Sequence, residues 1–188
     1  MSQAITHVVG FDDAPFLPSH RGDVRIIGAV FCRLRLEGVL QAKVRRDGRN
    51  ATSVIAGLVQ DSRYFPQLQC ILLQGITLAG FNVVDIHRLH DTTGLPVVTL
   101  ARHAPDLSAI QTALLNQVPG GRAKWRLIER AGPMEAVAGV HIQRAGISLL
   151  DTGRMIAAFA VNSLIPEPLR TAHLIAAGLS DRSSHKRV

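Results

Sequence analysis

Three short runs of apolar residues, each followed by polar residues, constrain the fold of this chain most. They span residues 5–11, 70–73 and 95–100, and apolar residues dominate them without strict alternation. Such a pattern is typical of strands in the buried middle of a parallel or mixed sheet. Because aromatic residues make up only 4% of the chain, the core is expected to consist of Val, Ile, Leu and Ala. The runs therefore predict an α/β fold with an aliphatic core.

An antiparallel hairpin is predicted between the first and second runs. Residues 24–36 and 38–46 are rich in β-forming residues, and Glu37-Gly38 separates them as a turn. Basic residues fall on odd positions of both strands, and odd positions of a strand share a face. The hairpin is therefore expected to carry a basic face formed by Arg33, Arg35, Lys43 and Arg45.

Helical spacing of apolar residues and typical capping residues predict five helices. They are expected from Asn50 or Thr52 to near Tyr64, and over 81–91, 105–115, 148–161 and 167–179. Two further strands are predicted over 124–130 and 137–144.

The order of these elements indicates the architecture. A strand, a hairpin and then alternating helices and strands form the layout of a ribonuclease H-like mixed sheet, and other mixed α/β folds share it. With 188 residues, the chain is expected to form a single domain over 1–179 with a disordered basic tail over 180–188. In the ribonuclease H-like layout the first strand lies beside the strand at 70–73, and catalysis takes place where their C-terminal ends meet.

Polar residues that suit a metal site follow both of these strands. Asp12 and Asp13 end the first strand, and Gln74 ends the second. Carboxylates are needed at this place for phosphodiester cleavage with metal ions, because Mg²⁺ prefers hard anionic oxygen. Since adjacent strand residues point to opposite faces, Asp12 is the expected site residue, with Asp13, Asp47 and Asp85 as further candidate ligands of Mg²⁺ or Mn²⁺. The alternative is that Asp12 and Asp13 are solvated residues at a loop entry and bind no metal.

Several other classes of site find no support in the sequence. The chain contains no P-loop, no Gly-x-Gly-x-x-Gly, no Gly-x-Ser-x-Gly, no His-Glu-x-x-His and no Cys-x-x-Cys motif. Cys32 and Cys70 lie in apolar stretches, which is typical of reduced thiols. No signal peptide and no apolar run of about 18 residues is present, so we expect a cytoplasmic protein without a membrane span.

The chain is strongly basic, and its basic residues cluster. The formal net charge is +7, and arginine supplies 18 of the 21 basic residues. Arginine binds phosphate in a bidentate manner, although codon usage alone can produce the same bias. The clusters lie at residues 21–49 and 122–130, the second with Trp125 inside it. Arg122, Lys124 and Arg126 therefore join the hairpin residues as a predicted nucleic-acid surface, with a merely solvated outer face as the alternative.

Residues 71–102 resemble the central motif of endonuclease V, in which a strand ends in Asp-Gly and a helix leads to a Pro-x-x-x-x-Ala-Lys strand. They read ILLQGITLAGFNVVDIHRLHDTTGLPVVTLAR. Together with GFDDAPF, DGRNAT and IPEPLRTAHLIAAG, this segment is still more similar to a small, mostly archaeal family of uncharacterised proteins that is grouped with endonuclease V. The resemblance covers most of the chain and implies a ribonuclease H-like fold.

The resemblance also assigns residues. Asp12 matches the first-strand metal-binding Asp of endonuclease V, Gly75 matches its motif glycine, and Arg102 stands where that enzyme has Lys. Gln74 replaces its second metal-binding Asp. The Pro-Arg pair that follows the Asp-Gly motif is absent, and the Glu ligand has no identified match.

Two functions from different classes follow. The first is an endonuclease V-like protein that interacts with nucleic acid and retains metal-assisted phosphodiester hydrolysis at Asp12, Gln74 and Arg102, where Arg102 offsets phosphate charge. The second is a non-catalytic nucleic-acid-binding or protein-interaction module on the same fold. Binding that weakens steeply with salt and is unchanged in Asp12→Ala would favour the second.

Overall fold

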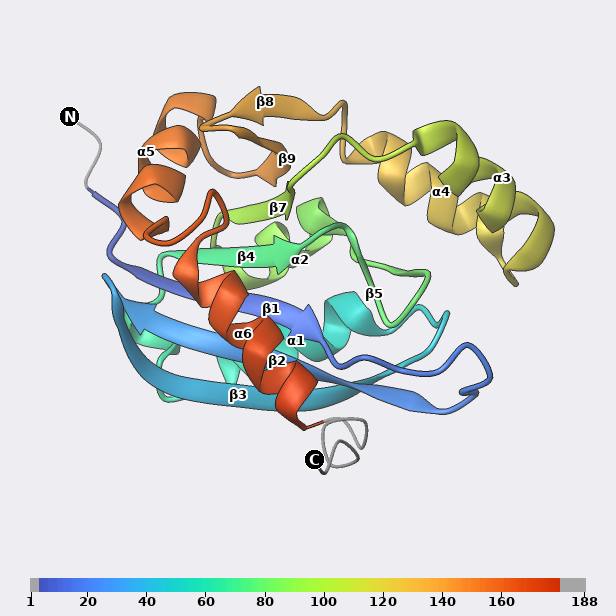
Figure 1. Ribbon diagram of the computed structural model, residues 1–188, viewed down its shortest axis with the longest axis horizontal. Coiled ribbons are helices and arrows are strands. Elements are labelled where there is room, and N and C mark those ends of the chain that lie inside the picture. Colours follow the sequence, from blue (N-terminus) through green and yellow to red (C-terminus); the bar gives the residue numbers. More distant parts are fainter. Residues whose placement is uncertain (1–3, 180–188) are drawn as a thin grey trace, which may run out of the picture.

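A seven-stranded mixed sheet forms the centre of the molecule, which a computed structural model describes over residues 4–179 (Figure 1). The strand order is β3-β2-β1-β4-β7-β9-β8. The strands are β1 (His7–Asp13), β2 (Asp23–Cys32), β3 (Arg35–Arg45), β4 (Cys70–Gln74), β7 (Val97–Ala101), β8 (Glu135–Val137) and β9 (Val140–Ala145). Strands β1, β4 and β7 run parallel to one another, and the remaining neighbours pair antiparallel. The predicted mixed sheet, with the first strand beside the strand at 70–73, is confirmed.

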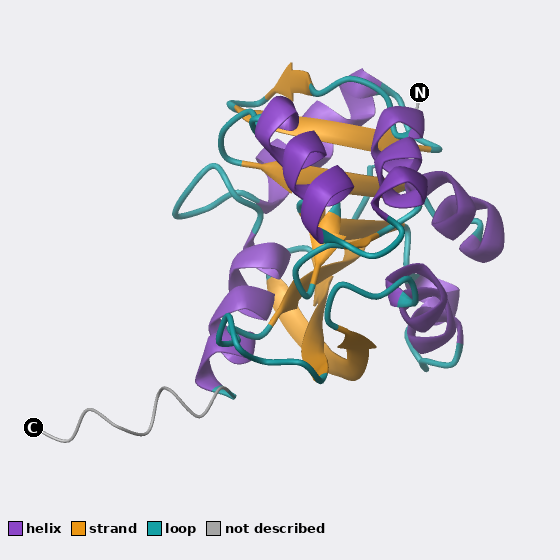
Figure 2. Cartoon of the chain, turned by 90° about the vertical axis from the view of Figure 1, so that its right-hand side faces the viewer, coloured by secondary structure: helices purple, strands orange, loops and turns teal. Residues whose placement is uncertain are grey.

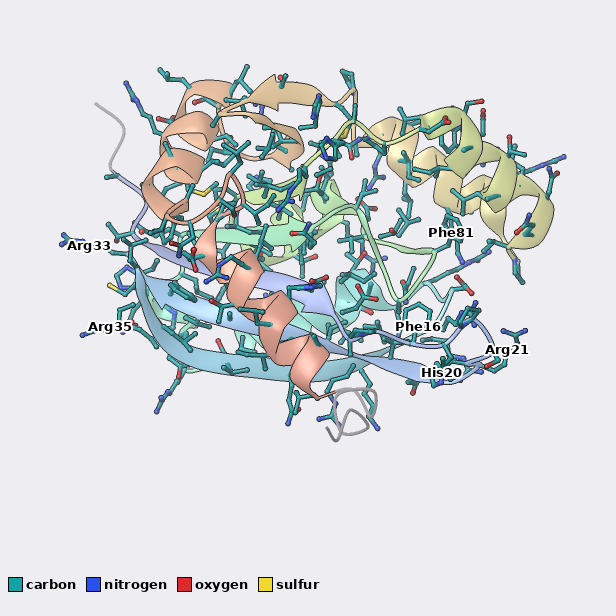
Figure 3. All side chains as sticks on the ribbon, in the orientation of Figure 1. Phe16, His20, Arg21, Arg33, Arg35 and Phe81 are labelled. Atoms are coloured by element: carbon teal, nitrogen blue, oxygen red, sulfur yellow. The ribbon has the colours of Figure 1, made fainter. Side chains whose placement is uncertain are left out.

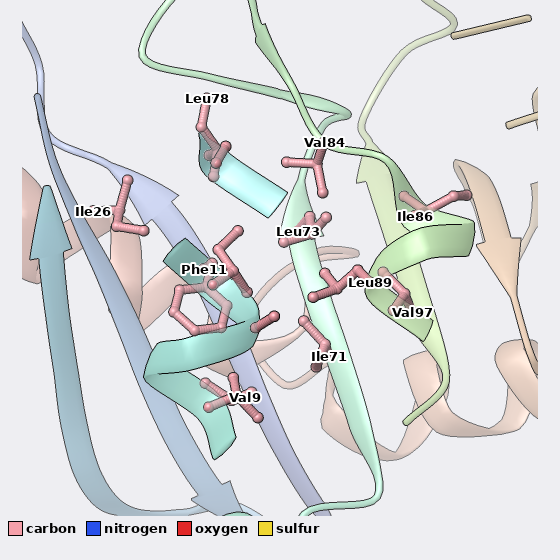
Figure 4. Packing of buried hydrophobic residues seen from close by; sticks show 14 of the residues in the cluster. Val9, Phe11, Ile26, Ile71, Leu73, Leu78, Val84, Ile86, Leu89 and Val97 are labelled. Atoms are coloured by element: carbon pink, nitrogen blue, oxygen red, sulfur yellow. The ribbon is translucent and has the colours of Figure 1, made fainter. Parts of the chain in front are cut away.

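Helices cover both faces of this sheet (Figure 2). The helices are α1 (Ala51–Gln60), α2 (Ile86–Thr93), α3 (Leu107–Gln117), α4 (Gly121–Arg130), α5 (Leu149–Phe159) and α6 (Glu167–Gly178), with a 3₁₀ turn η1 (Phe65–Gln67). Helices α1 and α2 bury one core with Val9, Phe11 and Ile71 from the sheet (Figure 4). Helices α5 and α6 bury a second core on the opposite face with Val8 and Leu72. The two cores use alternate residues of the same strands, which explains the unbroken apolar runs.

Helices α3 and α4 pack together beyond the C-terminal ends of β4 and β7 (Figure 1). A small hairpin of β5 (Thr77–Leu78) and β6 (Asn82–Val83) connects β4 to α2. Val83 of this hairpin joins Leu114 and Ile128 in a small third cluster, which anchors the helix pair. The chain thus places extra elements around the sheet edge at which the predicted site residues lie.

Capping residues set several helix boundaries. Asp85, Asp106 and Ser148 accept hydrogen bonds from first-turn amides of α2, α3 and α5. Gly94 ends α2 in the left-handed conformation, with φ 72°. None of the helices within residues 4–179 is long and apolar enough to cross a membrane.

The turn of the β2–β3 hairpin lies four residues earlier than predicted. Arg33 and Leu34 form the turn, with Arg33 at φ 53°. Glu37 is instead the unpaired residue where the register between β2 and β3 shifts. The predicted turn at Glu37-Gly38 is wrong because a glycine inside a strand pattern suits a bulge as well as a turn.

The same bulge separates the basic residues of the hairpin. Paired residues of an antiparallel ladder share a face, and the extra residue reverses the alternation along β3. Lys43 and Arg45 are exposed on one face, whereas Arg35, paired with Cys32, lies on the other. Arg33 belongs to the turn at the far end of the hairpin (Figure 3). The four residues therefore do not form the single basic face that their odd positions predict.

Two other secondary-structure predictions are corrected. Residues 124–130 form part of helix α4 and not a strand, because the buried residues Gly121, Lys124 and Ile128 recur at helical spacing. The predicted helix over 81–91 starts only at Ile86, after β6. The tail expected over 180–188 lies outside the described residues.

Candidate active site at the ends of β1 and β4

Asp12 and Gln74 lie at the same level on neighbouring parallel strands. Phe11 and Leu73 are the last paired residues of β1 and β4, so Asp12 and Gln74 come next on the two strands. Both follow Val8 and Leu72 in the strand alternation and therefore face α6. Asp12 is only 5% exposed, so its carboxyl group lies under the helix and not in bulk solvent.

Helix α6 brings His173 onto this carboxyl group. The Nδ1 atom of His173 lies 2.8 Å from Oδ2 of Asp12, and Oδ1 of Asp12 accepts a hydrogen bond from the backbone N–H of Asp13 at 2.9 Å. Burial raises the pKa of Asp12, and the hydrogen bond from His173 counteracts this in part. Asp12, Gln74 and His173 thus form a polar cluster at the C-terminal edge of the sheet, called the Asp12 cluster below.

His173 is the site residue that sequence reasoning did not identify. It lies in the segment IPEPLRTAHLIAAG, between the buried Ala172 and Ala176 of the helix face that packs on the sheet. A histidine beside the apolar stripe of a helix indicates proximity to the sheet, but its partner lies 161 positions earlier in the sequence. Only the packing of α6 on β1 reveals that partner.

Asp13 points to the opposite face of β1 and contacts the β5–β6 hairpin. Its Oδ2 accepts a hydrogen bond from the backbone N–H of Ala79 at 3.0 Å. Burial, and then the negative charge of Asp12, raise the pKa of Asp13 to about 6. Asp13 therefore helps to hold the hairpin in place, and its charged form is disfavoured in the folded state.

This shift predicts a pH-dependent effect of Asp13→Asn on stability. A carboxyl group whose pKa rises from 3.8 to about 6 on folding loses stabilisation as pH rises from 4 to 6. Asn stays neutral and keeps an oxygen that accepts from Ala79. We expect Asp13→Asn to match the wild type at pH 4 and to exceed its free energy of unfolding by about 2–3 kcal/mol at pH 7.5.

The comparison requires urea unfolding in EDTA at both pH values, so that a bound cation does not stabilise the charged form. A difference between variant and wild type that is the same at both pH values would contradict the raised pKa of Asp13. Asp106→Asn, at the exposed cap of α3, is the matched control, because Asn caps a helix as well as Asp does.

Asp47 also contacts the β5–β6 hairpin. Its Oδ1 accepts from the backbone N–H of Phe81 at 2.8 Å, and its own N–H donates to the carbonyl oxygen of Ala79 at 2.9 Å. Ala79 and Gly80 have φ of 49° and 83°, so this turn is tight and needs such contacts. Asp13 and Asp47 therefore hold the same turn from two sides.

Asp85 is engaged elsewhere. Its Oδ1 caps α2 by accepting from the N–H of Arg88 at 3.0 Å, and its Oδ2 forms an ion pair with Arg130. Within residues 4–179 no three His, Cys, Asp or Glu side chains form a group that could hold a metal ion. The structure thus places Asp12 beside Gln74 and His173. Asp13, Asp47 and Asp85 each accept a hydrogen bond from a backbone amide, and Asp47 and Asp85 also form ion pairs with arginines.

Gly75 and Arg102 follow the ends of β4 and β7. Gly75 adopts φ 79°, where a side chain would be strained, and its N–H donates to the carbonyl oxygen of Leu100 at 2.9 Å. Arg102 comes directly after the last residue of β7 and is exposed. Gly75 directly follows Gln74 at the end of β4, and Arg102 follows the neighbouring strand β7. Both therefore lie at the same edge of the sheet as Gln74.

A cavity of about 160 Å³ opens beside Gly75 under the α3–α4 pair. Most of its lining is apolar, and Phe81 forms part of its wall. Two buried polar side chains, Thr99 and Gln143, also line it, and Oγ1 of Thr99 accepts from the N–H of Gln143 at 3.2 Å. The cavity therefore combines an aromatic ring with fixed polar groups next to the strand ends.

The basic residues predicted on α4 differ in their surroundings. Arg122 and Arg126 are exposed, whereas Lys124 is 2% exposed and its Nζ donates to the carbonyl oxygen of Asp47. Burial lowers the pKa of Lys124. Trp125 is half-buried and donates to Glu129 at 2.7 Å.

Comparison with known sequences identifies the family. A family model described as endonuclease dU matches residues 4–180. The chain belongs to the endonuclease dU family. A UPF0215 protein of Deinococcus radiodurans is 53% identical to it over 180 residues, which cover 96% of this chain and 92% of the relative. A UPF0215 protein of Methanothermobacter thermautotrophicus is 44% identical over 177 residues, covering 92% and 87% of the two chains.

Solved structures confirm the fold of this endonuclease dU family member. A protein of unknown function from Archaeoglobus fulgidus superposes with a TM-score of 0.87 at 31% identity, covering 94% of this chain and 99% of the other. Human endonuclease V superposes with a TM-score of 0.59 at 18% identity, covering 92% and 83%. Ciona intestinalis endonuclease V, in complex with DNA that contains an inosine, gives 0.54 at 13% identity, covering 89% and 82%. The fold is thus ribonuclease H-like, and the predicted relation to endonuclease V is confirmed.

Proposed function

We propose that this protein binds nucleic acid across the C-terminal edge of β1, β4 and β7 and hydrolyses a phosphodiester bond there with one divalent cation. The observation that carries the proposal is the buried carboxyl group of Asp12, held by His173 and placed beside Gln74. A buried acid at such a strand end is costly for the fold, which favours a functional role.

The donor set of the Asp12 cluster fits one hard cation and not two. Asp12 provides one anionic oxygen and Gln74 a neutral carbonyl oxygen, and Mg²⁺ completes its shell readily with water and substrate phosphate. A second ion would need further carboxylates, and within residues 4–179 no group of three His, Cys, Asp or Glu side chains provides them. The single cation shares the oxygens of Asp12 with the hydrogen bonds that they accept from His173 and Asp13. When bound, Mg²⁺ or Mn²⁺ supplies charge compensation and an acidified water molecule.

The protein side chains have separate roles in this proposal. His173 orients the carboxyl group of Asp12 through its Nδ1 atom and, when protonated, offsets the charge of that group. Arg102, exposed at the end of β7, binds the negatively charged phosphate. Gln74 orients ligands without adding charge, which weakens the cation site relative to one with a second acid.

The substrate that we propose is a strand containing uracil or hypoxanthine. The family name refers to dU, and the structural neighbour from Ciona intestinalis was solved with inosine-containing DNA. The cavity beside Gly75 supports this proposal, since Phe81 offers a stacking surface and Thr99 and Gln143 offer polar groups to a base removed from its helix.

The experiment is a nicking assay on labelled strands that carry a single uracil or inosine. We expect cleavage with Mg²⁺ or Mn²⁺, none in EDTA, and none on a strand with ordinary bases. Calorimetric titration with Mn²⁺ should report about one ion per chain. Absence of both nicking and cation binding would reject the catalytic proposal.

A second function, non-catalytic nucleic-acid binding, is favoured by Gln74 at the position where endonuclease V has an acid. It predicts binding whose affinity falls steeply with salt and is the same in the wild type and Asp12→Ala, with no cleavage under any metal condition. Salt-insensitive or absent binding would count against both functions and favour a protein-interaction module.

A further inference from the structure

A second cavity, of about 240 Å³ and with a more polar lining, lies between the N-terminal turn of α1, the start of α2 and one side of α4. Arg49, Arg88 and Lys124 line it, and we call it the basic cavity. It shares no lining residue with the Asp12 cluster. The β5–β6 hairpin lies between the two, since Asp13 binds the hairpin at Ala79 and the N–H of Ala51 in α1 binds it at Asn82.

Three cations line the basic cavity, against one acid in its lining, Asp85, and the nearby charge of Asp47, which attracts Lys124. No carboxylate within the described part of the chain forms an ion pair with Arg49, Arg88 or Lys124. The single acid in its lining, Asp85, uses one oxygen to cap α2 and pairs the other with Arg130. Lys124 is almost wholly buried and contacts a backbone carbonyl instead of a carboxylate. Arg49 and Arg88 are exposed and solvated, so an anion in the cavity gains their hydrogen bonds in addition to the charge of Lys124.

Two of the cations in the cavity make close contacts within the protein. The guanidinium of Arg49 packs against Gly120 so closely that a Cβ atom there would come within 1.7 Å of its Nη2 atom. Lys124 is fixed by its contact with the carbonyl oxygen of Asp47. A fixed donor loses little conformational entropy on binding, so Lys124 is preorganised for a ligand, whereas Arg49 and Arg88 are exposed.

The first turn of α1 adds further donors. Thr52 and Ser53 line the cavity, and the turn contains no acidic residue and no side-chain cap. The N–H of Ala51 already donates to Asn82, which leaves the first-turn N–H groups of Thr52 and Ser53 to reinforce the field of the three cations. The chemistry of the whole lining suits a phosphate group.

We propose that the basic cavity binds a backbone phosphate of a nucleic-acid strand whose scissile bond lies at the Asp12 cluster. This inference rests on the proposed function, because it assumes that a strand crosses this edge of the molecule. Arg122 and Arg126 are also exposed on α4, but they lie two positions before and after Lys124 and therefore on a different face of the helix from the cavity lining. The proposal of a strand therefore rests on the cavity itself, and the second test below distinguishes a strand from a free phosphate ion.

The first test measures phosphate binding alone, by thermal unfolding in sodium phosphate and in sodium chloride of equal ionic strength. Phosphate should raise the Tm of the wild type above its value in chloride. The double variant Arg49→Gln/Arg88→Gln should lose this difference. The matched control Arg63→Gln/Arg154→Gln removes two exposed arginines outside the cavity and should keep it.

A further variant keeps the test informative if the double variant does not fold. Ser53→Glu places an acid in the first turn of α1, where it favours the helix dipole but repels an anion. It should retain or raise the Tm in chloride and abolish the response to phosphate. An unchanged phosphate response in Ser53→Glu and in the double variant would overturn the site.

The second test shows whether the cavity binds a nucleic-acid strand or only a free phosphate ion. It measures the affinity of the protein for a short single-stranded oligonucleotide in EDTA, with all variants carrying Asp12→Asn as well. The double variant Arg49→Gln/Arg88→Gln should weaken oligonucleotide binding about tenfold. A plot of log affinity against log salt concentration should also become less steep, by about 0.7 for each phosphate that the variant no longer binds. Loss of the phosphate response with unchanged oligonucleotide affinity would overturn the assignment to a strand. Because no cleavage is measured, failure of the catalytic proposal leaves both readouts intact.

Discussion

Asp12→Asn is expected to lower divalent-ion-dependent nicking by at least about 100-fold. The substitution keeps the shape of the side chain and one of its two accepting oxygens, and it removes the anionic ligand from the only member of the Asp12 cluster that carries negative charge. Because burial raises the pKa of Asp12, the neutral side chain should leave stability in EDTA unchanged or increased. Nicking rates at saturating Mn²⁺, together with urea unfolding, measure the two effects separately.

The matched control for this prediction is Asp106→Asn, which removes the same charge from the exposed cap of α3. It should nick at the wild-type rate. Affinity for an uncleaved oligonucleotide in EDTA should stay the same or rise slightly in Asp12→Asn, since a negative charge has been removed. Wild-type nicking by Asp12→Asn would place the reaction elsewhere on the molecule, whatever the strand-binding data show.

Gly10→Ala is expected to lower the free energy of unfolding by about 2–3 kcal/mol. A Cβ atom on Gly10 would lie 2.6 Å from the backbone carbon of Pro168 and 2.7 Å from the backbone nitrogen of Leu169. Backbone atoms at the start of a helix cannot rotate away as a flexible side chain can, so α6 must move off β1. This movement should also withdraw His173 from Asp12 and slow nicking in the molecules that remain folded.

The control for Gly10→Ala is Gly57→Ala in α1, where an added Cβ atom would meet nothing within 4 Å. That substitution should stabilise the protein by about 0.5–1 kcal/mol, because Ala favours a helix interior over Gly. Urea unfolding of both variants gives the comparison. Equal stability of Gly10→Ala and the wild type would mean that α6 does not rest on β1 as closely as the structure has it.

Much of the architecture could be predicted from the sequence because it follows from local patterns. The apolar runs identified β1, β4 and β7, and the helices predicted over 148–161 and 167–179 correspond to α5 and α6. The errors arose where one local pattern fits two structures. A glycine at position 38 suits a turn or a bulge, and the β-forming residues around Trp125 belong to a helix because tertiary packing buries every third or fourth residue.

Some features of the candidate site could likewise be predicted from the sequence, and others could not. Asp12 and Gln74 were predicted as neighbours, because strand ends in a recognisable sheet order meet at one edge. The roles of Asp13, Asp47 and Asp85 could not be predicted, since each depends on which backbone amide happens to lie within hydrogen-bond distance after folding. The burial of Lys124 could not be predicted either, because the sequence pattern placed this residue on a strand with its side chain on a nucleic-acid surface.

The sequence by itself determined the aliphatic core, the placing of Asp12 at the end of a buried strand and the succession of elements that is typical of this mixed sheet, because hydrophobic periodicity and the order of elements along the chain can be read without tertiary contacts. Only the tertiary structure decided that His173 contacts Asp12 and that Arg49, Arg88 and Lys124 share one cavity. These contacts join residues that are tens of positions apart or more. They exist because helices α1, α2, α4 and α6 pack at fixed positions around the sheet, and no local pattern encodes those positions.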